Sequence, residues 1–159
     1  MGYAQLWKLD ADGEDRKIDY LGTLAKHTQA VNVVRWAPKG KQASYTNFGQ
    51  QPNSRVGDLL ASAGDDGNVI LWVLDEGKTA TPAFGGNAFE DKEVWRTKHM
   101  CRSSGAEIYD LAWSPDGVYF IIGSMDNIAR IYNAQTGKYY ALQLRIDAHS
   151  YRFPGATNR

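Results

Sequence analysis

The chain has 159 residues, a length that suits one domain of ordinary size. Its 18 lysines and arginines balance its 18 aspartates and glutamates, which argues against broad electrostatic binding to nucleic acid or to a membrane surface. Hydrophobic residues make up 43% of the chain, and no apolar run approaches the roughly 18 residues that span a bilayer, so a soluble globular domain is expected. The one cysteine, Cys101, excludes an intramolecular disulfide and fits a reducing compartment.

Short segments with strand-like composition follow one another along the whole chain, and no stretch shows a sustained helical period. In chain order these segments are 4–9, 18–24, 31–36, 59–63, 68–73, 94–100, 107–113, 118–123, 128–132 and 139–146. Turn formers separate many of them, such as those at 65–67 and 114–117. The pattern predicts an all-β fold.

The chain contains an internal repeat, because residues 27–40 align with 103–117 and residues 58–72 align with 118–132. The matched positions are Trp36 with Trp113, Pro38 with Pro115, Gly40 with Gly117, Asp66 with Asp126, and Trp72 with Tyr132. The first copy carries an insertion, 41–57, rich in Gln, Asn, Ser and Gly, which predicts a loop. The spacing from Ser104 to His149 matches the period of a four-stranded propeller blade, about 40–45 residues.

This repeat resembles the WD40 family of β-propellers. The resemblance implies that His27, Ser62, Asp66 and Trp72 form the buried hydrogen-bonded network of a blade. In the second copy only Asp126 remains of these four positions, so its network is either absent or rebuilt. We therefore expect the substitution Asp126→Ala to cost less stability than Asp66→Ala.

The same resemblance divides the chain into two nearly complete blades and part of a preceding one. Residues 1–26 are expected to end the preceding blade, 27–100 to form a blade with the loop insertion 41–57, and 101–147 to form a second blade. The tail 148–159 has no blade pattern. We therefore expect the chain to be a fragment of a longer propeller.

Three stretches are more specific than the general pattern: 27–36, 59–72, and 107–117 taken with 123–138. Together they are similar to the WD40 subunits of chromatin assembly factor 1, particularly the fungal form, and the related HIR-type chaperones share much of the pattern. The resemblance implies a nuclear, non-enzymatic interaction subunit that acts in replication-coupled nucleosome assembly.

The implied partners are a large scaffold subunit, histones H3 and H4 through indirect contact, and another histone chaperone that binds regions absent from this chain. No cofactor, membrane contact or direct sequence-specific DNA binding is implied. The alternative from another class is a WD40 substrate receptor or scaffold of a ubiquitin ligase.

Two other chemistries have weaker support in the sequence. His27, Ser62 and Asp66 are the residue types of a hydrolase triad, but no Gly-x-Ser-x-Gly turn surrounds any serine. His99 and Cys101 would share one face of a strand and could begin a metal site, although structural zinc needs four ligands. The strand-ending tryptophans Trp36, Trp72 and Trp113 are expected to pack in the core.

Half of the acidic residues gather in two predicted connections, 8–17 and 73–93, which should emerge on one face of the propeller. These connections hold nine acidic residues against five basic ones. They are either a solvated loop face or a docking surface for a basic partner such as a histone. The candidate partner-binding residues in the second connection are Asp75, Glu76, Glu90, Asp91 and Glu93.

Overall fold

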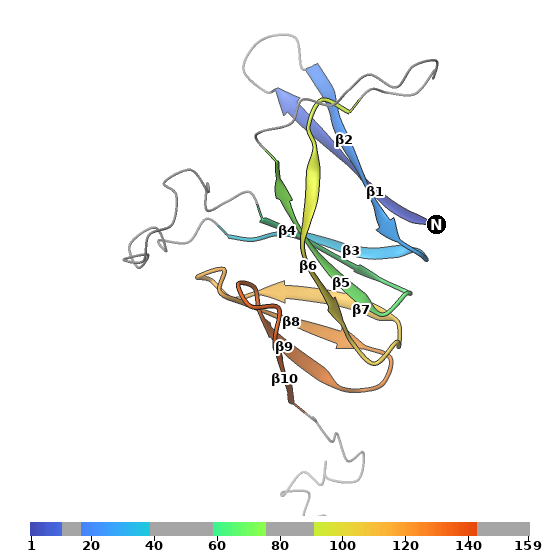
Figure 1. Ribbon diagram of the computed structural model, residues 1–159, viewed down its shortest axis with the longest axis vertical. Helices are drawn as coiled ribbons and strands as arrows, with labels where there is room; N and C mark the ends of the chain where they lie inside the picture. Colours follow the sequence, from blue (N-terminus) through green and yellow to red (C-terminus); the bar gives the residue numbers. More distant parts are fainter. Residues whose placement is uncertain (11–16, 39–58, 76–90, 143–159) are drawn as a thin grey trace, which may run out of the picture.

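A computed structural model describes residues 1–10, 17–38, 59–75 and 91–142, which form ten strands and no helix (Figure 1). The strands are β1 (Gly2–Asp10), β2 (Lys17–His27), β3 (Val31–Trp36), β4 (Leu59–Gly64), β5 (Asn68–Leu74), β6 (Trp95–Arg102), β7 (Ile108–Trp113), β8 (Tyr119–Ser124), β9 (Ala129–Asn133) and β10 (Tyr139–Leu142). Each segment predicted from the sequence overlaps one of these strands, so the all-β prediction is confirmed. No membrane-spanning helix is found in the described ranges.

The strands form three antiparallel sheets in chain order. The first sheet is β1–β2, the middle sheet is β3–β4–β5–β6, and the last sheet is β7–β8–β9–β10. In the two four-stranded sheets each strand pairs with the next one along the chain, as in a propeller blade. The predicted insertion 41–57 and the tail 148–159 lie outside the described residues.

The middle sheet is covered on both faces, and its sequence reflects this. Leu60, Ile70 and Trp72 face the first sheet, where they pack in a cluster with Leu6 and Leu24. Residues next to them in β4 and β5 alternate to the opposite face and enter a second cluster, shared with the last sheet. The members of this second cluster are Val33, Ala61, Ala63, Val69, Leu71, Cys101, Ile108, Leu111, Phe120, Ile122, Tyr132 and Ala134. The strands β4 and β5 therefore read as nearly continuous apolar runs, as expected for strands buried on both faces.

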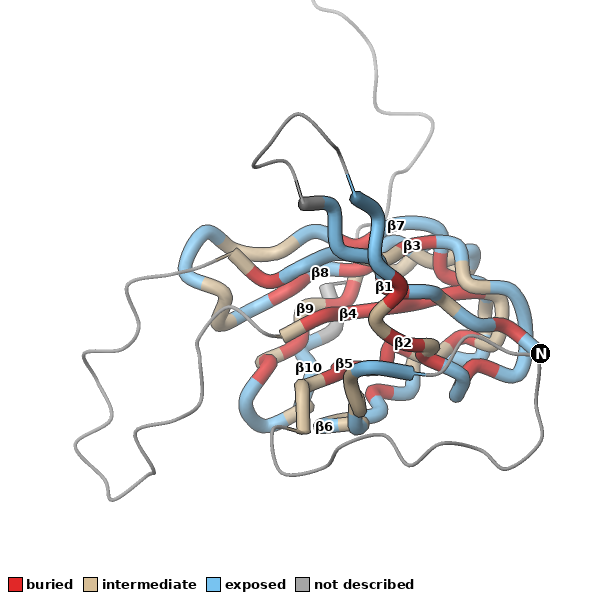
Figure 2. Tube along the Cα trace, turned by 90° about the horizontal axis from the view of Figure 1, so that it is seen from above, coloured by how far each residue is buried: buried red, intermediate tan, exposed pale blue. Residues whose placement is uncertain are grey.

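The last sheet is covered on one face only within the described residues. In β8 the buried Phe120 and Ile122 alternate with the exposed Tyr119 and Ile121 (Figure 2). In β9 the buried Arg130 and Tyr132 alternate with half-buried residues. One face of this sheet contributes to the shared core, and the other carries exposed apolar side chains.

Polar contacts join the middle and last sheets at both margins. Along the innermost strands, the Asn32 amide donates to the Ile108 carbonyl at 3.0 Å, and the Trp113 indole donates to the Arg35 carbonyl at 3.2 Å. At the outer margin the Nε2 of His99 lies 2.7 Å from the Gln135 carbonyl oxygen. These bonds fix the two sheets against each other at both ends of the apolar core.

One expectation about the tryptophans is wrong. Trp72 is 2% exposed and Trp113 is partly buried, but Trp36 is 52% exposed. Trp36 ends β3 beyond the core, where its ring stacks edge-to-face on Trp95 with centroids 5.6 Å apart. A strand-ending position is therefore not enough to bury a tryptophan in this chain.

Candidate functional site

The first polar network joins β2, β4, β5 and the turn between β4 and β5. The Nδ1 of His27 lies 2.9 Å from Oδ2 of Asp66, and Nε2 of His27 lies 2.8 Å from Oγ of Ser62. The indole N–H of Trp72 donates to the same Ser62 oxygen at 2.8 Å. The structure thus brings all four residues that the WD40 pattern indicates into one continuous chain of hydrogen bonds.

A neutral His27 satisfies every donor and acceptor in this network. Nδ1–H donates to Asp66, and the Ser62 hydroxyl donates to Nε2 while accepting the hydrogen bond of Trp72. Asp66 also accepts the backbone N–H groups of Thr28 and Asn68, each at 3.0 Å. Burial acts to raise the pKa of Asp66, but these two N–H groups and His27 outweigh it and lower that pKa.

The order Asp66, His27, Ser62 matches that of a hydrolase triad, but the serine cannot act as a nucleophile. Ser62 is 1% exposed, so a substrate has no access to its oxygen. One lone pair of that oxygen is also occupied by the Trp72 indole. The geometry is that of a buried network that joins three strands.

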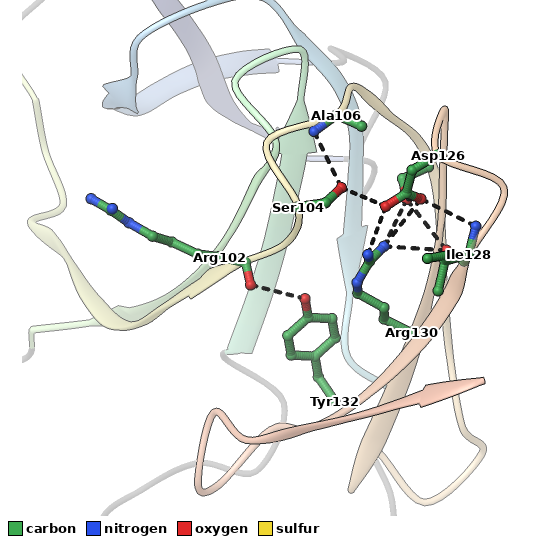
Figure 3. A network of polar contacts seen from close by, with 8 residues as sticks. Arg102, Ser104, Ala106, Asp126, Ile128, Arg130 and Tyr132 are labelled. Atoms are coloured by element: carbon green, nitrogen blue, oxygen red, sulfur yellow. Dashed lines mark hydrogen bonds and ion pairs between the residues drawn. The ribbon is translucent and has the colours of Figure 1, made fainter. Parts of the chain in front are cut away.

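The second network lies at the matching turn of the last sheet and is rebuilt around an arginine (Figure 3). The Nη2 of Arg130 lies 2.6 Å from Oδ2 of Asp126, and Nη1 lies 3.2 Å from Oδ1. Asp126 also accepts hydrogen bonds from the Ser104 hydroxyl, from the Ser124 hydroxyl at 2.5 Å and from the Ile128 N–H at 3.1 Å. Arg130 and these donors hold the pKa of Asp126 far below its ordinary value, against the opposing effect of burial.

The two turns share one backbone design. The backbone N–H of Gly67 donates to the carbonyl oxygen of Gly64 at 3.1 Å, and the backbone N–H of Asn127 donates to the carbonyl oxygen of Ser124 at 3.1 Å. Gly67 and Asn127 both have a positive φ, at 68° and 59°, which glycine and asparagine tolerate best. The aspartate before each therefore occupies the same place in both sheets.

The partner of the turn aspartate changes through two exchanges that compensate each other. In the middle sheet Ser62 pairs in register with Ile70, and in the last sheet Ile122 pairs with Arg130. The serine of the middle sheet is replaced by an isoleucine in the last sheet, and the isoleucine opposite it is replaced by Arg130, which is only 6% exposed. The aligned copies carried this signal, because a buried isoleucine position became arginine, but sequence reasoning missed it.

Tyr132 aligns with Trp72, but its hydroxyl bonds to neither Asp126 nor Arg130. Its hydroxyl donates to the Arg102 carbonyl of the middle sheet at 3.3 Å (Figure 3). Its ring stacks on Phe120 with centroids 5.1 Å apart and an interplanar angle of 6°. Burial raises the pKa of Tyr132 to about 12. Tyr132 thus bonds across the sheet boundary, whereas Trp72 bonds within its own sheet.

Three of the five candidate acids in the connection between β5 and β6 lie in the described residues. Asp91 accepts the Tyr20 hydroxyl at 2.6 Å and the Thr23 N–H at 3.1 Å, and Glu93 accepts the Trp95 indole N–H at 3.0 Å. These two acids therefore make contacts within the chain. The backbone N–H of Asp75 donates to the carbonyl oxygen of Val94 at 2.8 Å, where the connection begins and ends. Glu76 and Glu90 lie outside the described residues.

His99 and Cys101 lie on one face of β6, as their spacing predicts. No group of three His, Cys, Asp or Glu residues that could hold a metal occurs in the part of the chain that the structure describes. Cys101 is buried in the shared core, and burial raises the pKa of its thiol to about 11. Both residues pack against the last sheet or its turns.

Comparison with known proteins agrees with this architecture. The family model described as "WD domain, G-beta repeat" matches residues 18–73, and "Anaphase-promoting complex subunit 4 WD40 domain" matches residues 54–149. Both descriptions are of WD repeats, so the matches report the repeat architecture.

The chain is also similar to curated proteins of chromatin assembly. It is 41% identical over 135 residues to a Schizosaccharomyces pombe protein named as a subunit of chromatin assembly factor 1, covering 84% of this chain and 23% of that protein. The Saccharomyces cerevisiae protein of the same name is 38% identical over 155 residues, with 84% and 30% covered. "Protein HIRA" of Zea mays is 34% identical over 128 residues, with 80% and 11% covered. The chain thus spans less than a third of the length of these relatives.

Proposed function

The chain belongs to the WD40-repeat family, and from this premise we propose that it is a protein-interaction subunit of a histone-chaperone complex that assembles nucleosomes. One observation carries the proposal. Two fungal proteins named as subunits of chromatin assembly factor 1 are 41% and 38% identical to it across 84% of the chain. The maize protein HIRA is less similar, at 34% identity, which favours the chromatin assembly factor over the HIR-type complex.

We propose a non-enzymatic role. The one triad-like set in the described residues, Asp66, His27 and Ser62, is committed to a buried network. A propeller of this kind offers rigid sheets and connecting loops as binding surfaces. Its proposed partners are a large scaffold subunit, histones H3 and H4 through indirect contact, and another histone chaperone. The proposed location is the nucleus.

The acidic face of the propeller is a proposed docking surface for a basic partner. Asp91 and Glu93 hold the connection against β2 and β6, so the test neutralises the two candidate acids Glu76 and Glu90. Their combined neutralisation to glutamine is expected to weaken capture of a basic partner. Glu107→Gln, which neutralises an exposed acid just before β7, is the control.

Affinity purification from the native host tests the proposed function. The full-length protein, tagged and recovered at near-physiological salt, is expected to bring down a large chromatin assembly scaffold together with histones H3 and H4. Recovery of a ubiquitin-ligase adaptor in place of that scaffold would contradict the proposal. The relatives above lend no support to the ligase alternative, since their names refer to chromatin assembly and to HIRA.

A further inference from the structure

The outer margin of the middle sheet is a strand edge with one side open. In the order β3–β4–β5–β6 the last strand pairs along its length with β5 and, among the described residues, with no other strand. Figure 2 places β6 at the periphery of the molecule. Such an edge presents backbone N–H and C=O groups that can pair with another extended chain.

Three of the four exposed side chains of β6 are cations, and the fourth is Met100. Arg96, Lys98 and Arg102 are exposed, whereas Thr97 between them is half-buried. Among the described residues none of the three cations has an ion pair or a side-chain hydrogen bond. Burial of the Lys98 stem, and then repulsion by Arg96, lower the pKa of the Lys98 ammonium group. Within the described ranges no acidic side chain pairs with these cations, so this part of the edge is electropositive.

The outer edges of the other two sheets differ. Strand β2 mixes Lys17 and Lys26 with Asp19, and Asp19 pairs with Lys92 at 3.3 Å. Strand β10 begins with two tyrosines. Within the described ranges, β6 is therefore the outer edge whose exposed charges have a single sign.

The register places these cations on both sides of the edge. Arg102 lies opposite Asn68 and Arg96 lies opposite Val73. Asn68 and Val73 are five positions apart on one strand, so they and their partners point to opposite faces of the sheet. A bulge opposite Leu71 and Trp72 leaves Lys98 without a register partner. An added strand would therefore have a cation beside it on either face.

We propose that the free edge of β6 binds an extended, acidic peptide segment of a partner protein, which adds a fifth strand to the middle sheet. Main-chain hydrogen bonds would supply the pairing, and glutamate or aspartate side chains would meet Arg96, Lys98 and Arg102. The site goes beyond the proposed function, because it does not depend on which complex the chain joins.

A charge-reversal experiment tests the recognition. The full-length protein is titrated into a fluorescent octapeptide of alternating glutamate and valine, and binding is followed by anisotropy. The combined variant Arg96→Glu, Lys98→Glu and Arg102→Glu is expected to weaken binding by about tenfold or more. The matched control makes the same change of charge on the first sheet, with Lys8→Glu, Lys17→Glu and Lys26→Glu, and is expected to bind like the unaltered protein.

Amide hydrogen exchange tests the strand pairing, and it uses the unaltered protein, so it decides the question even if the substitutions unfold the chain. Amides of residues 95–102 are expected to gain protection when the peptide is bound. The proposal is overturned if the peptide does not bind, if the control variant weakens binding as much as the β6 variant, or if residues 95–102 gain no protection. In each of those cases the cations of β6 serve only to keep the edge from pairing.

Discussion

Arg130 holds Asp126 with two nitrogens, at 2.6 and 3.2 Å, in the place where His27 holds Asp66 with one nitrogen at 2.9 Å. The side chains of Arg130 and Asp126 are only 7% and 20% exposed, so the pair is largely withdrawn from water. Two repeats with the same turn thus secure the same aspartate by different chemistry. The ion pair argues against the expectation that Asp126→Ala costs less stability than Asp66→Ala.

Asp126→Ala is now expected to cost at least as much stability as Asp66→Ala. Removing Asp126 leaves a buried guanidinium group without its counter-ion, which costs about 3–5 kcal/mol in comparable pairs. Removing Asp66 leaves His27 and two backbone N–H groups without an acceptor, at about 1–3 kcal/mol. Urea melts of the two variants in the full-length protein measure the difference. A clearly smaller loss for Asp126→Ala would show that water reaches the Arg130 site.

The double variant Asp126→Asn with Arg130→Met isolates the ion pair from the turn. Asparagine keeps acceptors for the Ile128 N–H and the serine hydroxyls, and methionine restores the apolar character that Ile70 has in the middle sheet. Replacing a buried pair by groups of similar volume is often nearly neutral. The double variant is therefore expected to recover most of the stability that Arg130→Met alone loses. Additive losses in a double-mutant cycle would contradict this account.

Stability is expected to fall in acid through these two aspartates. The folded state lowers the pKa of both Asp66 and Asp126, so the unfolded chain binds more protons as the pH drops below its ordinary aspartate pKa, about 3.9. Their contribution is full above that pH and declines as the pH approaches the folded pKa. Denaturant melts between pH 7 and pH 3 should show a shallower decline for Asp126→Asn than for the unaltered protein. Parallel curves would exclude Asp126 as a source of the acid sensitivity.

Part of this structure could be predicted from the sequence, for physical reasons that particular residues show. The alternation around Phe120 and Ile122, and the aligned turn formers at Asp66 and Asp126, mark strands and turns locally. The alternation pattern of β9 alone does not show that Arg130 is buried, and the clue was its alignment with Ile70 of the first copy. The exposure of Trp36 depends on where the neighbouring sheet ends. Local patterns thus locate the strands, and packing decides what each side chain touches.

The insertion between β3 and β4 is expected to be dispensable for folding. The backbone N–H of Ala37 donates to the carbonyl oxygen of Leu59 at 2.9 Å, and this bond joins the two ends of the insertion. In the same way, the backbone N–H of Ser114 donates to the carbonyl oxygen of Tyr119 at 2.9 Å across the short turn of the last sheet. Replacing residues 38–58 by the four residues 115–118 should therefore keep the strand register. Loop closure changes slowly with length, so the change in unfolding free energy should stay within about 1 kcal/mol. A loss of several kcal/mol would mean that the insertion packs against the fold.

The outer face of the last sheet is exposed in the described residues, whereas both faces of the middle sheet are covered. It exposes Tyr119, Ile121 and Tyr140, while Phe120 and Ile122, which alternate with the first two, are buried in the shared core. An open propeller is expected to leave some apolar strand residues without a packing surface. Ile121 is such a residue, whereas Ile70 and Leu111 are buried. Exposed apolar faces of this kind drive association.

The 159-residue chain expressed alone is therefore expected to form oligomers or a loosely packed species that binds hydrophobic dyes. Burying one aliphatic side chain contributes about 1.5–3 kcal/mol, whereas a whole domain is stable by only about 5–15 kcal/mol, so a few uncovered side chains are a large fraction of the total. Size-exclusion chromatography with light scattering measures the association, and Ile121→Lys should reduce it because the charge interrupts the exposed face. Lys138→Glu, on an exposed turn of the same sheet, is the control and should leave association unchanged. A monodisperse monomer with a sharp cooperative melt would show that the last sheet is stable with this face in water.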